Sequence, residues 1–385
     1  MTAAKGFAAA GVHAKIRRDR KDLAVVRMLG EGTGAAMWTQ NRVLAAPVVV
    51  SKRHLAIAEP QAIVINSGVA NAATGAQGEA DAVATAEHAA ALLELAPEQV
   101  LVLSTGVIGA PLPLDRVRAG LDEAVPNLST DGGADAAEAI LTTDTKTKLA
   151  VSMGSGFTVG GMAKGSGMIH PNLATMLAVV TTDYPLQPGE SLDFLQPAVD
   201  TSFNSISVDG ECSTNDAVVL LASGAVQLER TPATDAAFVL ALKKVCAELA
   251  AQVVADGEGA TLVAEISVEG AVDATQARAI ARRIATSPLV KTALFGHDAN
   301  WGRVLMAAGS APHNGGYADI DADRATLRYN DVVVLDHGSP TGVEPDVSGA
   351  SCAIALELGL GDGAASYLTS DLSYEYVRIN GEYRS

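Results

Sequence analysis

The sequence lacks the features that mark several classes of protein. Only three cysteines occur, Cys212, Cys246 and Cys352, and they are far apart and form no CxxC motif. This spacing argues against a disulfide framework and against a zinc site. No apolar run approaches the roughly 20 residues of a membrane span, and the N-terminal segment has no apolar core long enough for a signal peptide. We therefore expect a cytoplasmic protein.

Clustered positive charge is also missing. The chain has 27 Lys and Arg residues against 44 Asp and Glu residues, which gives a formal net charge of -17. Nucleic acids and anionic membranes are bound by clustered Lys and Arg, so neither is an expected partner. What the chain does have is length, 385 residues, and apolar composition, 48%. Both indicate a globular protein with two lobes or one large layered domain, whose partners are small molecules.

Strand, loop and helix patterns alternate along the first half of the chain. Strand-like segments flank a glycine-rich turn, and a buried strand precedes a helix that ends near Leu95. Next come a strand, a tight loop and another helix. The segments are 22–29 and 42–51 around the turn at 30–37, then the buried strand 62–68, and the loop 104–109. This alternation predicts an α/β architecture.

The second half predicts further helices and strands without a long linker between them. The predicted helices are 133–141, 234–255 and 274–286, the predicted strands include 157–165 and 261–271, and 295–309 is predicted to be a loop. Short strands are expected from there to the tail. No internal repeat is visible.

The segment "KGSGMIHPNLATMLAVVTTD" (164–183) changes sharply from a glycine-rich approach to an apolar run at Thr175. The ordinary interpretation is a β-branched residue that begins a buried strand. The alternative is a nucleophile, whose hydroxyl needs a neighbouring base. A free α-amine on the same residue, with an ordinary pKa of about 7.7 to 8.0, is such a base. It requires cleavage between Ala174 and Thr175, and the pattern alone leaves both interpretations open.

Motifs spread over nearly the whole chain resemble one family. They are "KGF" (5–7), "INSGVANAATG" (65–75), "STGVIG" (104–109), "TTDTKTK" (142–148), "KGSGMIHPNLATML" (164–177), "DGECSTNDAV" (209–218), "DGEGAT" (256–261), "SPLVKTALFGHDANWGR" (287–303) and "YVRINGEYRS" (376–385). Together they are similar to the glutamate N-acetyltransferase, or ornithine acetyltransferase, family of bifunctional arginine-biosynthesis proteins. Family members cleave themselves before the threonine of the ATML motif.

The resemblance implies a mechanism and an active site. Thr175 would be the nucleophile that takes the acetyl group from N2-acetyl-L-ornithine and passes it to L-glutamate by ping-pong transfer, with its own α-amine as base. Thr105 and Gly106 would stabilise the oxyanion. The implied substrate-binding residues are Thr142, Lys164, Thr175, Glu258, Asn380 and Ser385. A lysine suits the α-carboxylates of both substrates, and a carboxylate suits the side-chain ammonium of ornithine. Thr143 competes with Thr142 for the same role.

The implied fold is a layered αββα-like sandwich of mixed sheets. It would be cut into an α chain of 1–174 and a β chain of 175–385, which assemble as a heterotetramer of two α and two β chains. No metal or cofactor is implied, and acetyl-CoA stands as an alternative acetyl donor. Val69 replaces the asparagine usual in the family, and Cys212 has no assigned role. Two other functions stay open, a related N-terminal-nucleophile amidohydrolase or aminopeptidase and a small-molecule binding protein that never cleaves.

Overall fold

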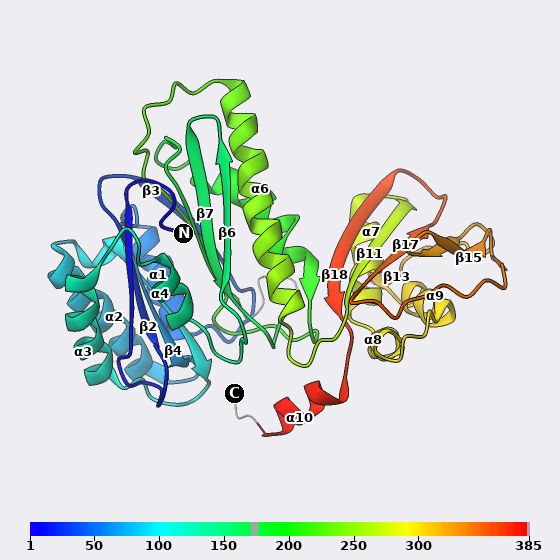
Figure 1. The fold of residues 1–385 in the computed structure, drawn as a ribbon, viewed down its shortest axis with the longest axis horizontal. Coiled ribbons are helices and arrows are strands. Elements are labelled where there is room, and N and C mark those ends of the chain that lie inside the picture. Colours follow the sequence, from blue (N-terminus) through cyan, green and yellow to red (C-terminus); the bar gives the residue numbers. More distant parts are fainter. Residues whose placement is uncertain (171–175, 383–385) are drawn as a thin grey trace. The chain divides into compact units, whose positions relative to one another are not determined.

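The computed structural model, shown in Figure 1, describes residues 1–170 and 176–382, and it divides into two compact units. The first unit comprises Met1–Asn204 and Glu211–Val253, and the second comprises Ser205–Gly210 and 254–382. Two lobes were one of the two arrangements expected from the length of the chain. The predicted division at 174/175 is a division by cleavage, and it stays a prediction.

Two β-sheets form the centre of the first unit. One has the strand order β1-β2-β4-β5 and the other β3-β10-β8-β7-β6. The strands of the first are β1 (Phe7–Val12), β2 (Leu23–Met28), β4 (Ala62–Val69) and β5 (Val100–Val107). Those of the second are β3 (Thr33–Trp38), β6 (Lys148–Gly154), β7 (Phe157–Lys164), β8 (Leu177–Thr182) and β10 (Ala217–Ala222). Both sheets contain parallel and antiparallel pairs, so the predicted mixed sheets are confirmed.

The two sheets pack face to face, with helices on their outer sides. One hydrophobic cluster joins Ile65 and Leu103 of the first sheet to Met162 and Val179 of the second. A separate cluster packs α1, α2 and α3 against the first sheet. On the second sheet, α6 lies so close to Gly161 that an added Cβ would be 2.8 Å from a side-chain carbon of the helix. The predicted αββα-like layering is therefore confirmed.

The helices of the first unit, with α6 reaching the second, are α1 (Ala46–Leu55), α2 (Gly75–Leu93), α3 (Leu114–Ala124), α4 (Gly133–Ala139), α5 (Ser191–Asp200) and α6 (Pro232–Ala255). Short 3-10 turns are η1 (Pro97–Gln99), η2 (Val125–Asn127) and η3 (Phe203–Ser205). Within the described residues, none of the helices combines the length and the apolar character needed to span a membrane.

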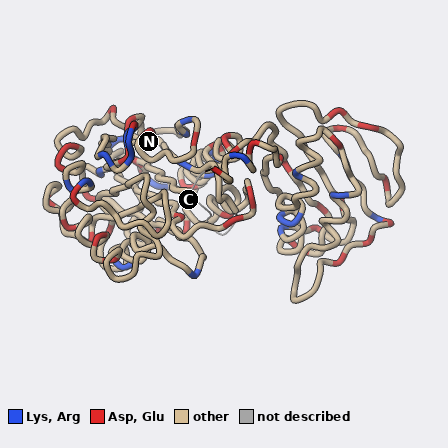
Figure 2. Tube along the Cα trace, turned by 90° about the horizontal axis from the view of Figure 1, so that it is seen from below, with Lys and Arg blue, Asp and Glu red and all other residues tan. Residues whose placement is uncertain are grey.

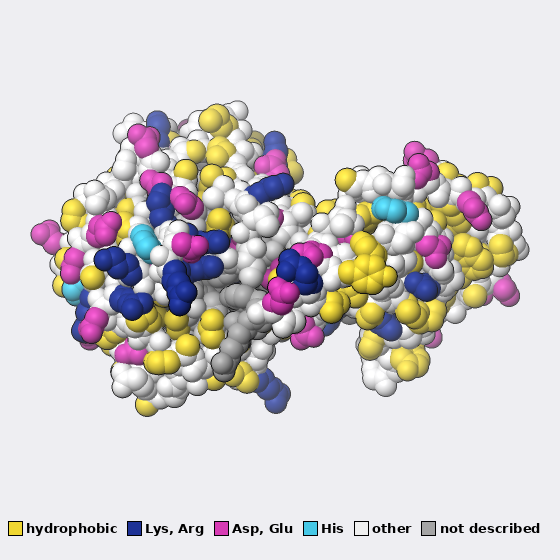
Figure 3. Space-filling view, turned by 60° about the horizontal axis from the view of Figure 1, so that its bottom comes forward, with side chains coloured by type: hydrophobic (Ala, Val, Ile, Leu, Met, Phe, Trp, Pro, Cys, Tyr) yellow, Lys and Arg dark blue, Asp and Glu magenta, His cyan; other side chains and the backbone are white. Residues whose placement is uncertain are grey.

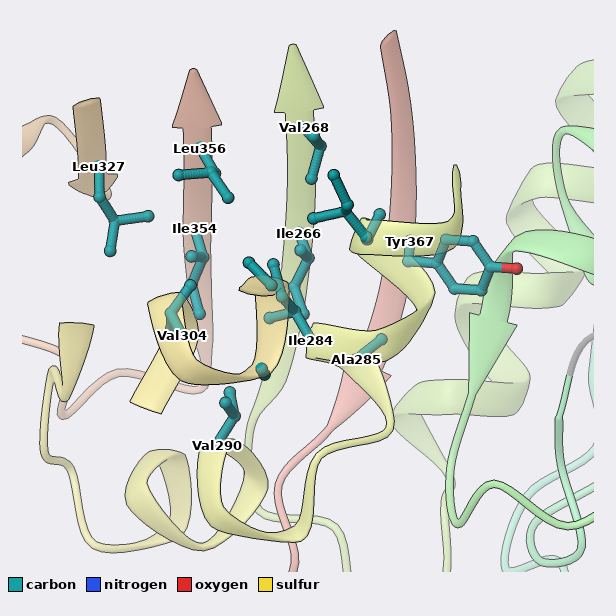
Figure 4. Packing of buried hydrophobic residues seen from close by; sticks show 14 of the residues in the cluster. Ile266, Val268, Ile284, Ala285, Val290, Val304, Leu327, Ile354, Leu356 and Tyr367 are labelled. Atoms are coloured by element: carbon teal, nitrogen blue, oxygen red, sulfur yellow. The ribbon is translucent and has the colours of Figure 1, made fainter. Parts of the chain in front are cut away.

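The second unit is built on a seven-stranded sheet with the order β16-β15-β14-β17-β11-β18-β9. Its strands are β9 (Ile206–Ser207), β11 (Val263–Ala271), β14 (Thr326–Tyr329), β15 (Val332–Asp336), β16 (Ser339–Pro340), β17 (Ser351–Glu357) and β18 (Gly363–Ser370), and β12 (Pro312–His313) pairs with β13 (Gly316–Tyr317). Its helices are α7 (Ala274–Ala285), α8 (Pro288–Phe295), α9 (Trp301–Gly309) and α10 (Tyr374–Glu382). Figure 4 shows Ile266 and Ile354 of the sheet facing Ile284 and Val304 of the helices, and this contact forms the core.

Several local predictions were wrong. The segment 42–51 was expected to be a strand, but 46–55 is helix α1, because Pro47 starts it and its buried residues recur at helical spacing. The loop predicted at 104–109 is strand β5 as far as Val107, and the turn predicted at 30–37 is strand β3 from Thr33. Trp301–Gly309, expected as a loop, is helix α9, whose first turn is capped by Asn300.

Charge is distributed unevenly over the molecule. Acidic and basic residues are scattered along both units in Figure 2. Figure 3 nevertheless shows a group of Lys and Arg side chains on one face of the first unit. The net charge of -17 therefore does not make every surface of the protein negative.

Candidate active site

The loop predicted to hold the oxyanion is fixed by two glycines on neighbouring parallel strands. Gly68 of β4 lies opposite Gly106 of β5, and their φ angles are +108° and +134°. A Cβ on Gly106 would lie 2.2 Å from the carbonyl carbon of Gly68, a distance that no side chain tolerates. The close approach therefore requires glycine at 106, which suits a position where a backbone N–H must be presented to a ligand.

Thr105 lies at the end of this pair of strands. Its side chain is buried, and its hydroxyl makes no hydrogen bond within the described part of the chain. The residue before it is held on both sides, because Ser104 donates its hydroxyl to Asn66 (2.6 Å) and its carbonyl accepts from Asn215 (2.9 Å). A threonine hydroxyl on a rigid support, with its donor available, is what an oxyanion site needs.

The turn at 209–218 connects this loop to the start of β8. The amide of Asn215 donates to the carbonyls of Ala70 (2.7 Å) and Ser104 (2.9 Å). The next residue, Asp216, accepts a hydrogen bond from the backbone amide of Met176 at 3.0 Å. Two consecutive side chains thus link the predicted oxyanion loop to the residue that follows Thr175.

A buried charged cluster organises the other predicted residues of the first unit. Asp144 accepts hydrogen bonds from the Nζ of Lys148 (2.7 Å) and from the amides of Thr142 (3.0 Å) and Gly165 (2.7 Å). The Nζ of Lys164 lies 4.0 Å from the second oxygen of Asp144. Burial opposes ionisation of Asp144, but the charges of Lys164 and Lys148 outweigh it and hold the pKa of Asp144 well below its usual range. The carboxylate is therefore ionised at neutral pH.

Asp144 brings two of the predicted substrate-binding residues together. Thr142 also directs its hydroxyl to Asp144 at 3.4 Å, and it is buried, whereas Thr143 is half-buried. Lys164, the last residue of β7, lies opposite Leu177 in the antiparallel pair with β8. The side chain of Lys164 is 2% exposed, so it is surrounded by protein rather than by bulk water.

The second unit contains the remaining described candidates. Asn380 of α10 donates its side-chain amide to the carboxylate of Glu258 at 2.8 Å. The chain is a helix at this point, where short strands were predicted, and Glu375 and Glu382 form ion pairs with Arg378 on it. The family resemblance implies that Glu258 and Asn380 belong to one site, and within this unit they are in contact.

Three of the predicted site residues, Ala174, Thr175 and Ser385, lie outside the described residues. The described chain resumes at Met176, and strand β8 begins at Leu177. The roles given to those three residues stay predictions.

Sequence reasoning missed four residues that the structure places around the candidate site. They are Asp144, Lys148, Asn215 and Asp216, and all four belong to the motifs "TTDTKTK" and "DGECSTNDAV". Buried charge in an apolar context was the available signal, since Asp216 stands directly before an apolar strand. Their partners depend on strand order, which the motifs do not contain.

Val69 and Cys212 both make backbone contacts in the structure. The backbone carbonyl of Val69 accepts a hydrogen bond from the side chain of Asn66 at 2.9 Å. An asparagine side chain at 69 is not needed for that contact. Cys212 lies in the 209–218 turn, where its carbonyl accepts a hydrogen bond from Asn41 at 2.9 Å.

Comparison with known proteins places the chain in one family. The model of the ArgJ family matches residues 8–385. A protein of Symbiobacterium thermophilum named arginine biosynthesis bifunctional protein ArgJ is 44% identical over 400 residues, covering 100% of this chain and 98% of the relative. Its namesake from Mycolicibacterium paratuberculosis is 45% identical over 397 residues, covering 100% of this chain and 96% of the relative.

A solved structure of ornithine acetyltransferase from Mycobacterium tuberculosis, complexed with ornithine, is 42% identical in sequence. It matches 44% of this chain and 93% of the solved chain, with a TM-score of 0.42. The family match and the full-length relatives lead to the same conclusion: the chain belongs to the ArgJ family.

Proposed function

We propose that the protein transfers an acetyl group from N2-acetyl-L-ornithine to L-glutamate in the cyclic route of arginine biosynthesis. The proposal includes cleavage between Ala174 and Thr175 and a covalent acetyl-Thr175 intermediate. Membership of a family whose members are named bifunctional arginine-biosynthesis proteins supports it. So does the arrangement of the described residues on either side of the predicted cleavage point.

In the proposed first step, the chain processes itself. The hydroxyl of Thr175 attacks the carbonyl carbon of Ala174, and the peptide bond becomes an ester as the nitrogen of Thr175 leaves with a proton. Water then hydrolyses the ester, which frees the carboxylate of Ala174 and restores the hydroxyl. The α-amine released in this way sits on the same residue as the hydroxyl that it activates.

In the proposed transfer, the α-amine takes the proton of the Thr175 hydroxyl as its oxygen attacks the acetyl carbonyl of the donor. Thr105 supplies a hydroxyl and Gly106 a backbone N–H to the oxygen that becomes negative. Each such donor contributes about 10² to 10³ in rate. Ornithine leaves, L-glutamate enters, and its amine attacks the acetyl ester to form N-acetylglutamate and restore Thr175.

The charged groups of the two substrates are assigned to protein side chains of opposite charge. Lys164, whose Nζ lies 4.0 Å from Asp144, pairs with the α-carboxylate that acetylornithine and glutamate share. Glu258, oriented by Asn380, pairs with the side-chain ammonium that only ornithine carries. Thr142 and Ser385 complete the proposed set. The assembly proposed is a heterotetramer of two α and two β chains in the cytoplasm.

The observation that carries the proposal is the hydrogen-bonded path from residues 104–106 of β5 to residue 176. Ser104 is bonded to Asn215, and Asp216 is bonded to Met176. The end of β5 that carries the hydroxyl of Thr105 is thereby fixed relative to Met176, the residue directly after the proposed nucleophile.

The test is acetyl transfer measured with purified protein, acetylornithine and glutamate, for the wild type and a Thr175→Ala variant. We expect acetylglutamate only when glutamate is present, and none from the variant. Acetate release that glutamate does not change would instead indicate a hydrolase. A single band near 39.2 kDa on a denaturing gel would indicate a binding protein that never cleaves. Repeating the assay with acetyl-CoA in place of acetylornithine decides whether this protein also uses the second donor.

A further inference from the structure

The contact between Glu258 and Asn380 in the second unit does not fix either side chain by itself. Glu258 is half-buried and Asn380 is exposed, so water competes with the hydrogen bond between them. A glutamate side chain also has several rotatable bonds, whose freedom opposes a single preferred position. The position of the Glu258 carboxylate therefore depends on how the chain on each side of the contact is held.

The hydroxyl of Ser373 joins the two segments that carry these side chains. It donates a hydrogen bond to the carbonyl of Gly259, the residue directly after Glu258, at 2.6 Å. It also accepts the amide of Tyr376 at 3.3 Å in the first turn of α10, the helix that carries Asn380. Ser373 is buried, so water competes less for these two bonds than for the exposed contact between the side chains.

The turn that contains Glu258 is packed on two sides. A Cβ on Gly259 would lie 2.5 Å from the amide nitrogen of Tyr376, so the backbone of the turn lies directly against the first turn of α10. A Cβ on Gly257 would lie 3.2 Å from a side-chain carbon of Val208. The turn is thus enclosed between Val208 and the start of the helix.

Asp371 ties the same two segments together a second time. Its carboxylate accepts the amides of Thr261 (2.8 Å) and Leu262 (3.1 Å) and the hydroxyl of Thr261 (2.6 Å). Its own amide donates to the carbonyl of Leu262 at 3.1 Å. The chain leading to Ser373 is therefore fixed to the chain that follows Glu258, which makes Ser373 a rigid point of attachment.

We propose that Ser373 is a positioning residue for the recognition of ornithine, because its hydroxyl determines where Glu258 lies relative to Asn380. This inference rests on the proposed function, in which Glu258 pairs with the side-chain ammonium of ornithine. Ser373 acts through Glu258, and L-glutamate, which has no side-chain ammonium, does not depend on it. A serine that only capped a helix would contribute to stability without distinguishing the two substrates.

The test compares Ser373→Ala with the conservative variant Ser373→Thr and with a matched control, Asn300→Ala. Alanine removes both hydrogen bonds of the hydroxyl, whereas threonine keeps a hydroxyl that can make them. Asn300 caps α9 of the same unit by accepting the amide of Arg303 at 3.2 Å, so the control removes a helix cap away from Glu258.

Steady-state kinetics give the KM values for acetylornithine and L-glutamate, and isothermal titration calorimetry gives the Kd for L-ornithine. We expect Ser373→Ala to raise the KM for acetylornithine and the Kd for L-ornithine about 10-fold, with the KM for L-glutamate within about twofold of the wild type. Ser373→Thr and Asn300→Ala should keep the wild-type values of all three constants.

Three results overturn the inference. One is an equal rise of both KM values in Ser373→Ala, because a general loosening of the site affects both substrates. Another is an unchanged Kd for L-ornithine in a folded Ser373→Ala variant. The third is a loss of ornithine affinity in Asn300→Ala as large as that in Ser373→Ala, since the effect would then belong to any lost cap.

If Ser373→Ala does not fold, Ser373→Gly takes its place, because glycine is tolerated at a helix cap and also lacks the hydroxyl. The calorimetric measurement separates this inference from the proposed function. A wild type that binds L-ornithine but transfers no acetyl group refutes the proposed function, and the Kd values of the variants still decide the role of Ser373. A wild type that binds no L-ornithine refutes both.

Discussion

Replacing Asp144 by asparagine tests how strongly a buried carboxylate stabilises the fold through two buried lysines beside the candidate site. The Nζ of Lys148 lies 2.7 Å from this carboxylate and that of Lys164 lies 4.0 Å away, and their side chains are 1% and 2% exposed. Asparagine carries no charge, and its single oxygen can accept from only one of the amides of Thr142 and Gly165, because these bond to different oxygens of Asp144. The substitution thus removes a buried negative charge from beside two buried lysines.

The expected cost follows from that geometry. Removing one partner of a buried ion pair costs about 3–5 kcal/mol, because the remaining charge stays desolvated. Two lysines share Asp144, so we expect a loss near the upper end, about 5 kcal/mol. Each kcal/mol lowers the melting temperature of a unit of this size by about 2–4 °C. Asp144→Asn should therefore melt about 10–20 °C below the wild type at neutral pH.

The pKa of Asp144 also predicts how the stability difference between the wild type and Asp144→Asn changes with pH. The folded-state pKa of Asp144 is held below its ordinary value, by Lys164 and Lys148 against the effect of burial. Its stabilising contribution is therefore fully present above an unfolded-state pKa of about 3.9, and it is lost as the pH falls towards the folded-state pKa. The difference between wild type and variant should persist from neutral pH to about pH 5 and shrink below about pH 4.

Differential scanning calorimetry at several pH values measures both quantities. Asp183→Asn serves as the control, since it neutralises a buried carboxylate that accepts two backbone amides. If Asp144→Asn melts no lower than Asp183→Asn at neutral pH, the lysines do not depend on Asp144, and the account of the charged cluster is wrong.

Four further substitutions test separate parts of the site and of the fold. Thr105→Val should lower kcat about 10²- to 10³-fold through loss of an oxyanion donor, and steady-state kinetics with an unchanged kcat would contradict this role. Gly106→Ala places a Cβ 2.2 Å from the carbonyl carbon of Gly68, so it should abolish transfer and lower the melting temperature, whereas a melting temperature equal to that of the wild type would refute the packing argument. Glu258→Gln should raise the KM for acetylornithine about 10- to 100-fold by removing a charged hydrogen bond, with little change in the KM for glutamate, and equal changes in both would exclude the assigned role. Burial lowers the pKa of Lys291 to about 7, against the charges of two nearby aspartates. Above pH 7 the unfolded state therefore binds one more proton than the folded state, and the free energy of unfolding should rise by about 1.4 kcal/mol per pH unit up to about pH 10. Urea unfolding should show a smaller slope in Lys291→Met, and an identical slope would contradict the shift.

The parts of the fold that sequence could predict are those in which local pattern and final burial agree. The strand at 62–68 and the helix that follows it were predicted closely, as β4 and α2, because apolar periodicity there matches the side that is buried. At 42–51 three consecutive valines favoured a strand. In the structure Val48 and Val50 are buried by the packing of a helix that begins at Ala46, so tertiary packing overrides β-propensity.

At the C-terminal end of the chain, the sequence pattern also predicted strands where the structure has a helix. Short strands were predicted as far as the C-terminus, and β18 confirms them up to Ser370. From Tyr374 the chain is helical, and the hydroxyl of Ser373 accepts the amide of Tyr376 at 3.3 Å in the first turn. A serine cap followed by Glu and Arg at helical spacing was the sequence signal available for this helix.

For the site, sequence identified the chemical groups but not their connections. Thr105, Gly106, Thr142 and Lys164 could be selected because they lie in motifs that resemble a family. The contacts of Asn215 and Asp216 arise because β10 pairs with both β3 and β8, which brings the start of β10 next to Met176. Strand order of this kind is a non-local property, and a single sequence does not encode it in any short pattern.

Intact-mass spectrometry of the purified protein after brief exposure to acetylornithine tests the central claim most directly. We predict two chains, one ending at Ala174 and one beginning at Thr175, with the second chain heavier by one acetyl group that glutamate removes. An uncleaved, fully active polypeptide, or an acetyl group carried on any residue other than Thr175, would contradict the account.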